Sequence, residues 1–482
     1  MSTVTINASS RPSESQPMRG IWWLPADPER TIGGQLTFVE REGGRLELLG
    51  GFFGQDAPQV PVVIFGTVAG KAITVCDASY QGRSTTQDWR TGGEETVTSE
   101  SWACYDVFVG IHSSEGSAQR FDAFILETAM LPVWVNKPRV DTERKEGSIV
   151  ITVPRPEPIF ASIENVGNIN LWWTSSERIG LNAEVSVTPK VEFQPVHGST
   201  VHEAWTAFVT PALFMVTFAT GVADRIVSLQ GRIDGRDDHP LHDRTVNIPV
   251  HRWTGEVPPS RSHHVYFHPV RFQDVESWFP HFVSNWFQIV VTSRDSFLDF
   301  VASSITPFLY LEEQFVRVVR AMESWHRRVI GGSYMDQASY ETLIERVLSL
   351  TAGRERQFLQ MRLQHANERS LKQRLDDLIA TAGEPVVSIV GTYSKFVRRV
   401  VSTRNSLVHD GKIGADFTYE ELAWATRSLE EVFKSALLHR LGFDPKAVAD
   451  AVKRSGAGSL LTGPGNPLMQ RSHDFPPGQI GA

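Results

Sequence analysis

The sequence predicts an α+β protein in two parts, a β-rich N-terminal domain folded as a sandwich or barrel and a C-terminal all-α helical bundle. Two observations lead to this fold class. Short runs of β-branched and aromatic residues, separated by Gly, Pro, Asn and Ser, fill residues 17–300. Beyond them, apolar residues recur every three or four positions, the period of a helix with one buried face. At about 100–200 residues per domain, a chain of 482 residues is long enough for two to four domains.

Two hairpins are the clearest local predictions in the β-rich half. Residues 36–49 contain a Glu-Gly-Gly turn between two apolar runs, and residues 62–77 contain Ala69-Gly70 in the same position. Glycine in a short loop between such runs is typical of a hairpin, because the turn needs a positive φ. Most of the tryptophans lie in or beside this half, and we expect them to pack in its core rather than to form a ligand platform.

The second half is predicted to be a bundle of five helices, at residues 308–325, 339–350, 354–380, 390–408 and 418–440. Thr418 and Glu421 have the spacing of a capping box, and Gly442 follows two cations that suit the end of a helix. We therefore expect a sensing or regulatory domain at residues 17–300 and a helical domain at 301–446. Residues 1–16 and 447–482, rich in Ser or in Gly and Pro, are expected to be a disordered N-terminus and a flexible tail.

Cysteine usage and hydropathy exclude several classes of protein. Cys76 and Cys104 are the only two cysteines, so a disulfide framework and a cysteine-based zinc site are excluded. A single bridge between them stays open, but two buried thiols in a reducing compartment fit better. The N-terminus has no apolar signal segment, and no apolar run reaches the ~18–20 residues that span a bilayer. We expect a cytoplasmic protein without membrane association.

The charge is unevenly distributed along the chain. The 47 Lys and Arg against 55 Asp and Glu give a net −8, which argues against nonspecific coating of nucleic acid. Between Arg317 and Arg404, however, 15 basic residues face 9 acidic ones, a net of +6, and the rest of the chain carries −14. Either the helices present ordinary solvated faces, or a basic bundle meets a polyanion.

Familiar catalytic motifs are absent from the sequence: it has no P-loop, no HExxH and no GxSxG. A segment rich in imidazole is a candidate metal-dependent hydrolase centre, with His239, His242, His251, His263, His264 and His268. Without a helix or tight turn to fix the ligands, we interpret this segment as a polar β-loop, and we expect neither a metal nor a cofactor.

The strongest candidate for chemistry lies at the end of the fourth helix, where Arg404 and Asn405 are followed by His409 and an Asp-Gly pair. Histidine can take a proton from a ribose 2′-hydroxyl or give one to a leaving 5′-oxygen. A guanidinium can hold the phosphate and its developing charge. In a straight helix a five-residue step turns about 140°, so Arg404 and His409 converge only if the helix ends or tightens after Leu407. The alternative is a helix end where a cation meets the dipole.

The Arg404-Asn405-x3-His409 segment, with Gly411 after it, resembles the signature of HEPN domains, specifically the abortive-infection type of ApeA-like anti-phage proteins. The N-terminal half is similar to the domain that precedes HEPN in this family, on the segments GIWWLP at 20–25, Gly34-x-Leu36-x-Phe38, Leu46-x-Leu48-x-Gly50 and IFG at 64–66. The resemblance extends to about Gly442.

The resemblance implies a metal-independent endoribonuclease that cleaves RNA, tRNA-like targets included, when a phage-derived trigger is sensed. HEPN domains pair, which implies a homodimer with a composite active site. Carried over by position, Arg404 and His409 are the catalytic pair, Asn405 supports them, and Glu323 in the first helix orients the Arg or the His. Because a helix Glu beside arginines is usually a surface ion pair, the assignment of Glu323 has an ordinary alternative.

Two further interpretations complete this picture. Arg398 and Arg399 are candidates to hold the RNA backbone near the site, or are simply solvated. The competing function is a noncatalytic, dimeric protein whose aromatic β-domain binds a ligand or phage component.

Overall fold

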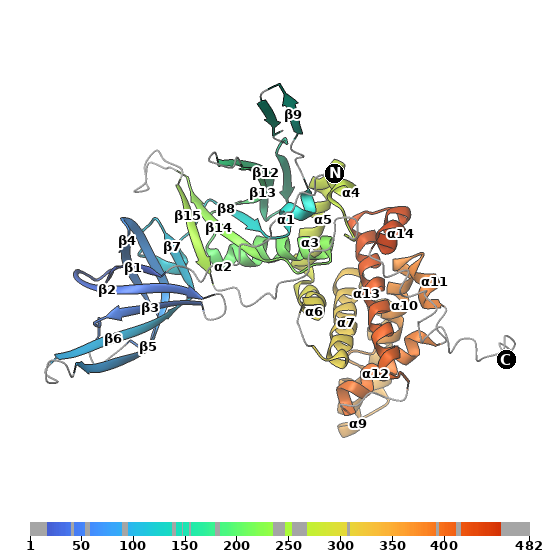
Figure 1. Cartoon of the computed structure of the whole chain (residues 1–482). Helices are drawn as coiled ribbons and strands as arrows, with labels where there is room; N and C mark the ends of the chain where they lie inside the picture. The colour runs from blue at the N-terminus through green and yellow to red at the C-terminus, as the bar shows by residue number, and fades with distance from the viewer. Residues whose placement is uncertain are drawn as a thin grey trace. The chain divides into compact units, whose positions relative to one another are not determined.

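The structure is a computed structural model that describes residues 17–39, 43–53, 58–88, 95–136, 141–146, 148–153, 156–178, 184–234, 246–252, 268–305, 309–391, 395–410 and 416–454. The chain forms two compact units. One comprises residues 1–132, 137–213 and 225–257, and the other comprises 133–136, 214–224 and 258–482. The first is mostly β-structure and the second is mainly helical, so the predicted fold class is confirmed (Figure 1).

A closed barrel of six antiparallel strands forms part of the first unit. Its strands are β1 (Met18–Leu24), β2 (Asp27–Val39), β3 (Gly43–Leu49), β4 (Val62–Val68), β5 (Lys71–Asp88) and β6 (Glu95–Cys104). Their order around the barrel is β1-β2-β3-β6-β5-β4, and β4 pairs with β1 again. Closure removes the unpaired strand edges of an open sheet. Trp22, Leu36, Leu46, Ile64 and Trp102 are fully buried in its core, as expected for tryptophans that pack rather than bind.

The strand pairs of both predicted hairpins are present in this barrel, although Glu42 of the Glu-Gly-Gly turn lies outside the described residues and its two glycines begin β3. β2 pairs with β3, and β4 pairs with β5 across Ala69-Gly70, where both residues have a positive φ. Cys76 and Cys104 are buried free thiols, as predicted, and burial raises the pKa of both, that of Cys104 to about 12.

A second antiparallel sheet completes the first unit. Its strands follow the order β11 (Ile159–Ile163), β12 (Gly167–Arg178), β13 (Glu184–Pro195), β8 (Ala123–Thr128), β14 (Ile226–Ile233) and β15 (Val246–Arg252). Strand β7 (Asp106–Val109) pairs with both β5 and β15 and so continues this sheet into the barrel. A short hairpin, β9 (Asp141–Lys145) and β10 (Ser148–Thr152), stands apart from both.

The helical unit is built around α13 (Tyr419–Leu441), whose apolar residues are buried along its whole length. It contacts α5 (Phe279–Thr292), α7 (Leu311–Trp325), α10 (Leu371–Ala382), α11 (Val386–Gly391) and α14 (Pro445–Arg454) (Figure 1). The predicted capping box is present, with Thr418 accepting from Glu421 N and Glu421 accepting from Thr418 N. The helix ends at Gly442 in a left-handed conformation, also as predicted.

Two helix predictions differ from the structure. The single helix expected at residues 354–380 is two helices, α9 (Gly353–Leu363) and α10, because Asn367 binds the backbone of Met335 and Ser370 caps α10. The helix expected at 390–408 is α12 (Phe396–Asp410), which runs past Leu407. With α8 (Gln337–Ser349), α11 and α14, this region has more helices than the five predicted.

No helix among the described residues is long and apolar enough to cross a membrane.

Candidate active site on helix α12

Helix α12 has a buried face and an opposite polar face. Phe396, Val400 and Thr403 are buried against the bundle. A stripe of four exposed polar side chains at helical spacing lies on the other side: Arg398, Ser402, Asn405 and His409. We call these four residues the polar stripe of α12. The local sequence favours this arrangement because Phe396 and Val400 recur at helical spacing on the buried face, although Val408 is 49% exposed.

Arg404 lies off this stripe and is held by two neighbours. Its Nη2 is 3.6 Å from Glu323 Oε2 on α7, and its Nη1 donates to Asn405 Oδ1 at 3.2 Å. The side chains of Arg404 and Glu323 are 28% and 22% exposed, so the pair is only partly shielded from water. The structure thus brings Glu323 of α7 to Arg404 and its neighbour Asn405, three residues whose roles the family resemblance implied.

Glu323 is itself positioned by further charges. Arg327, four residues further on in the π-helical turn η6 (His326–Ile330), donates to Glu323 Oε1 at 3.3 Å and lies 3.5 Å from Glu368. Glu368 in turn pairs with the buried Arg374 of α10 at 3.2 Å. The Glu323–Arg327 pair is visible in the sequence as an i,i+4 pair, but Glu368 is distant in sequence and carries no local signal.

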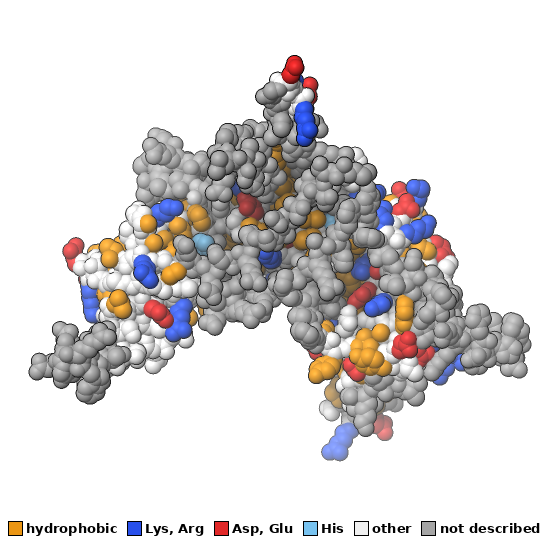
Figure 2. All heavy atoms as spheres, in the orientation of Figure 1, with side chains coloured by type: hydrophobic (Ala, Val, Ile, Leu, Met, Phe, Trp, Pro, Cys, Tyr) orange, Lys and Arg blue, Asp and Glu red, His pale blue; other side chains and the backbone are white. Residues whose placement is uncertain are grey.

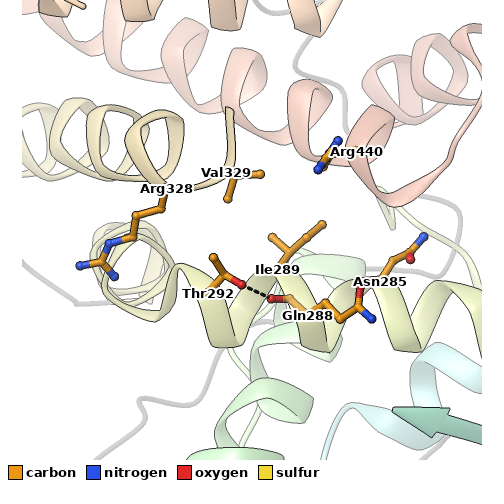
Figure 3. Close-up of a pocket in the computed structure, with 7 residues that line it drawn as sticks. All are labelled: Asn285, Gln288, Ile289, Thr292, Arg328, Val329 and Arg440. Atoms are coloured by element: carbon orange, nitrogen blue, oxygen red, sulfur yellow. Dashed lines mark hydrogen bonds between the residues drawn. The ribbon is translucent and has the colours of Figure 1, made fainter. Parts of the chain in front are cut away.

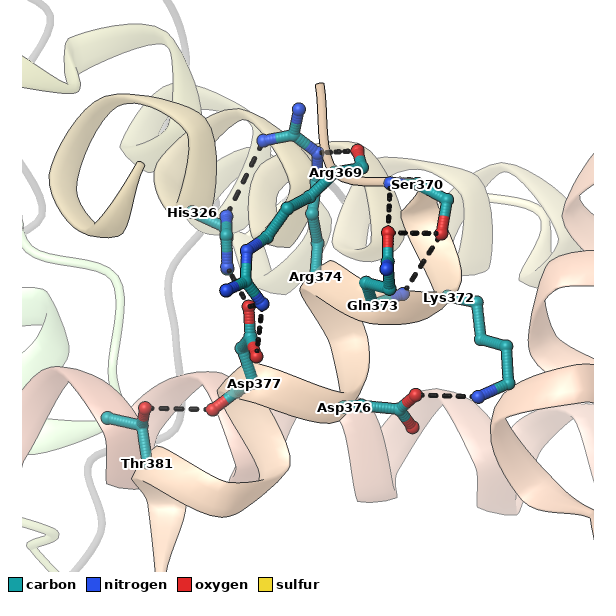
Figure 4. Close-up of polar contacts among 9 residues, drawn as sticks. All are labelled: His326, Arg369, Ser370, Lys372, Gln373, Arg374, Asp376, Asp377 and Thr381. Atoms are coloured by element: carbon teal, nitrogen blue, oxygen red, sulfur yellow. Dashed lines mark hydrogen bonds and ion pairs between the residues drawn. The ribbon is translucent and has the colours of Figure 1, made fainter. Parts of the chain in front are cut away.

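The chain of charges ends at the buried His326, which lies between Arg374 and the partly exposed Asp377. Arg374 Nη1 lies 3.5 Å from His326 Nδ1, and His326 Nε2 contacts Asp377 Oδ2 at 2.8 Å (Figure 4). Arg369 donates to the same carboxylate at 2.7 Å. Burial lowers the pKa of His326, although Asp377 acts in the opposite direction. His326 begins a π-helical turn, η6 (His326–Ile330), and is fully buried, so this imidazole anchors α7 to α10 and is closed to substrate.

His409 lies in the last turn of α12 and is exposed. Because α12 continues to Asp410, the step from Arg404 to His409 keeps its helical rotation of about 140°. The tightening after Leu407 on which their convergence depended is therefore not observed, and no hydrogen bond or ion pair joins the two among the described residues. The chain directs Arg404 towards α7 and leaves His409 exposed to solvent; Gly411 lies outside the described residues.

The two neighbouring arginines of α12 differ completely in environment. Arg398 is exposed on the polar stripe. The guanidinium of Arg399 donates to the carbonyl oxygen of Asp416, pairs with Glu421 at 3.0 Å, and covers the ring of Phe417 at 4.3 Å. The structure therefore commits Arg399 to holding α12 against the start of α13 and leaves Arg398 accessible.

The histidine-rich segment gives no support for a metal centre within the described residues. His251 packs against the ring of Phe38, His268 is fully buried, and the other four histidines lie outside the described residues. No group of three His, Cys, Asp or Glu side chains in the described parts of the chain could hold a metal ion.

A pocket of about 420 Å³ lies elsewhere in the helical unit, between α5, η6 and the end of α13 (Figure 3). Its lining is Asn285, Gln288, Ile289, Thr292, Arg328, Val329 and Arg440, none of which the sequence analysis predicted. Arg328 is already paired with Asp295 at 2.9 Å. Sequence reasoning could not find this pocket, because its walls come from three separate segments.

The chain thus combines a β-barrel with a helical bundle that carries Arg404, Asn405 and His409 on one helix. Residues 316–447 match the family described as Apea-like HEPN, and residues 17–286 match ApeA N-terminal domain 1. The second match covers more than half of the chain, so the protein belongs to the ApeA family, and the predicted resemblance is confirmed. No curated protein and no solved structure matches the chain.

Proposed function

We propose that the protein is a metal-independent endoribonuclease of the HEPN type, acting through Arg404 and His409. The observation that carries this proposal is the environment of the two residues. Arg404 is held by Glu323 and Asn405, which is how a phosphate-binding guanidinium is kept in one orientation, and His409 is exposed and ready for proton transfer.

The reaction needs two proton transfers at one phosphate. A neutral imidazole takes the proton from the ribose 2′-hydroxyl, the 2′-oxygen attacks phosphorus, and the bond from phosphorus to the 5′-oxygen breaks. A protonated imidazole gives its proton to the leaving 5′-oxygen. The products are a 2′,3′-cyclic phosphate and a 5′-hydroxyl. Arg404 stabilises the charge that develops on the phosphate oxygens.

Two copies of the chain make a complete site in this proposal. Each protomer has one His409, and its own Arg404 points elsewhere on the helix. If two α12 helices meet along their polar stripes, the second copy supplies the second imidazole. The homodimer through the HEPN domain is therefore part of this proposal, as the family resemblance implied.

Arg398 is the residue we assign to the RNA backbone, since it is exposed on the same stripe as His409. Arg399 is not part of this assignment because its donors are occupied by Asp416 and Glu421. The wider role we propose is anti-phage defence by abortive infection, in which a phage-derived trigger acting on the N-terminal domain releases cleavage of RNA, tRNA included, in the cytoplasm.

Cleavage of RNA by purified protein in EDTA tests the catalytic proposal. We expect wild type to form 2′,3′-cyclic phosphate ends, and His409→Ala to lower the rate by about 10²- to 10⁴-fold. The matched control is His281→Ala, which removes a histidine that is also exposed but lies on α5. This variant should cleave RNA at the wild-type rate. If His409→Ala cleaves as wild type does, the assignment is wrong. If no variant cleaves any RNA yet all protect cells against phage, the noncatalytic binding function replaces it.

A further inference from the structure

Helix α9 is the most exposed helix of the bundle among those described. None of its residues from Gly353 to Leu363 is buried, although Phe358 and Met361 are apolar. Their side chains are 54% and 68% exposed. A helix joined to the bundle through contacts with α8, yet presenting large apolar side chains to water, has a face that a partner can cover.

The arginines of this region lack the carboxylate partners that many arginines of the helical unit have. Ion pairs to carboxylates are formed by Arg317, Arg320, Arg327, Arg328, Arg369, Arg374, Arg399 and Arg404, whereas Arg398 and Arg427 form none within the described residues. Within the described parts of the chain, Arg354, Arg356 and Arg362 of α9 and Arg346 of α8 form no ion pair. Figure 2 shows Lys and Arg side chains projecting at the end of the bundle where Figure 1 draws α9.

The unpaired charges and the exposed apolar groups share one face of α9. The successive spacings along this face are four, three and one residues, which places the side chains on one side of the helix over about 12 Å. The residues are Arg354, Phe358, Met361 and Arg362. We call these four residues the α9 face. The guanidinium of Arg362 lies over the ring of Phe358, 5.6 Å from its centroid, as an i,i+4 pair should.

We propose that the α9 face binds single-stranded RNA, with Arg354 and Arg362 on phosphates and Phe358 stacking on a base. The inference rests on the proposed ribonuclease function and deepens it, because it assigns a substrate-recruiting surface separate from Arg404 and His409. Two unpaired guanidiniums flanking an exposed aromatic ring are the groups that single-stranded RNA recognises, by charge and by base stacking. If a second copy of this chain covered the α9 face, it would have to present acidic side chains to Arg354 and Arg362. RNA supplies a negative charge at every phosphate.

RNA binding should be measured by fluorescence anisotropy in the His409→Ala background, so that cleavage plays no part. The probe is a labelled single-stranded RNA titrated at several salt concentrations. Phe358→Ala should weaken binding roughly 5- to 150-fold at every salt concentration, the range for one stacked base. The double change Arg354→Ala and Arg362→Ala should weaken binding and reduce the slope of log affinity against log salt by about 1.4, or about 0.7 for each phosphate contact.

The matched control is Arg427→Ala on α13. Arg427 is also exposed and also lies over an aromatic ring, that of Trp424 at 5.6 Å. It should change neither the affinity nor the salt slope. All three variants change exposed side chains, and far-UV circular dichroism checks that each remains folded.

Three outcomes would overturn the proposal. One is wild-type affinity for both α9 variants. Another is an equal loss in Arg427→Ala, which would mean that any surface charge matters. The third is a shift from dimer to monomer in Phe358→Ala by sedimentation with RNA affinity unchanged, which would assign the face to a second copy. Failure of the proposed function looks different: RNA still binds the α9 face, but the enzyme with His409 intact does not cleave it.

Discussion

Replacing Arg399 by alanine should destabilise the helical unit, whereas the same change at its neighbour Arg398 should not. The guanidinium of Arg399 is 16% exposed and pairs at 3.0 Å with Glu421, whose side chain is 1% exposed. It also donates to Asp416 O and covers Phe417. Arg398 is exposed on the polar stripe. These adjacent residues therefore form a matched pair that differs in environment and not in chemistry.

The size of the expected loss in stability depends on the charge that stays buried once the Arg399 side chain is removed. Breaking a buried ion pair by removing one partner costs about 3–5 kcal/mol, because the other charge is left buried. Glu421 keeps the Thr418 amide at 2.7 Å, so we expect the low end of this range, about 3 kcal/mol, for Arg399→Ala. Arg398→Ala should change the free energy of unfolding by less than about 0.5 kcal/mol.

Urea unfolding, followed by the helical signal in far-UV circular dichroism, measures both values. Arg399→Lys should recover only part of the lost stability. An ammonium group cannot donate to Asp416 and Glu421 with the geometry of a guanidinium, and it cannot stack on Phe417. RNA affinity should show the reverse order, with Arg398→Ala binding more weakly and folded Arg399→Ala binding as wild type. A wild-type unfolding midpoint for Arg399→Ala would refute the structural role of this residue.

Two further predictions concern Glu323 and Asp106. Glu323→Gln removes the charge that holds Arg404, so RNA cleavage should slow by about 10- to 100-fold. The free energy of unfolding should change by less than about 1 kcal/mol. An unchanged cleavage rate would show that Arg404 does not need Glu323. Burial raises the pKa of Asp106 to about 6 from 3.8, against the opposing effect of Arg252. The folded state then binds the proton more tightly, so the stability of the β-rich unit should fall by up to about 3 kcal/mol as pH rises from about 4 to 6. Asp106→Asn should remove this dependence in pH-resolved thermal unfolding, and a persisting slope would place it on another group.

Local features of this protein follow from the sequence because their interactions are local. The β4–β5 hairpin depends on the backbone of Ala69-Gly70, and the start of α13 depends on Thr418 and Glu421 three residues apart. These two predictions needed only turn geometry and helix capping, and the structure has both. The end of α12 was predicted less well, since the helix expected to stop at Val408 runs on through His409 to Asp410.

Other features depend on segments that are distant in the chain, and only the tertiary structure decides them. The barrel closes because β4 returns to β1, which no local pattern specifies. Arg398 and Arg399 look equivalent in sequence, yet packing of α12 against α13 buries one guanidinium beside Glu421 and leaves the other in water. The break between α9 and α10 depends on Asn367 meeting Met335, a contact across 32 residues. A sequence states which side chains can pair, whereas burial, which sets the strength of each pairing, exists only once the chain has folded.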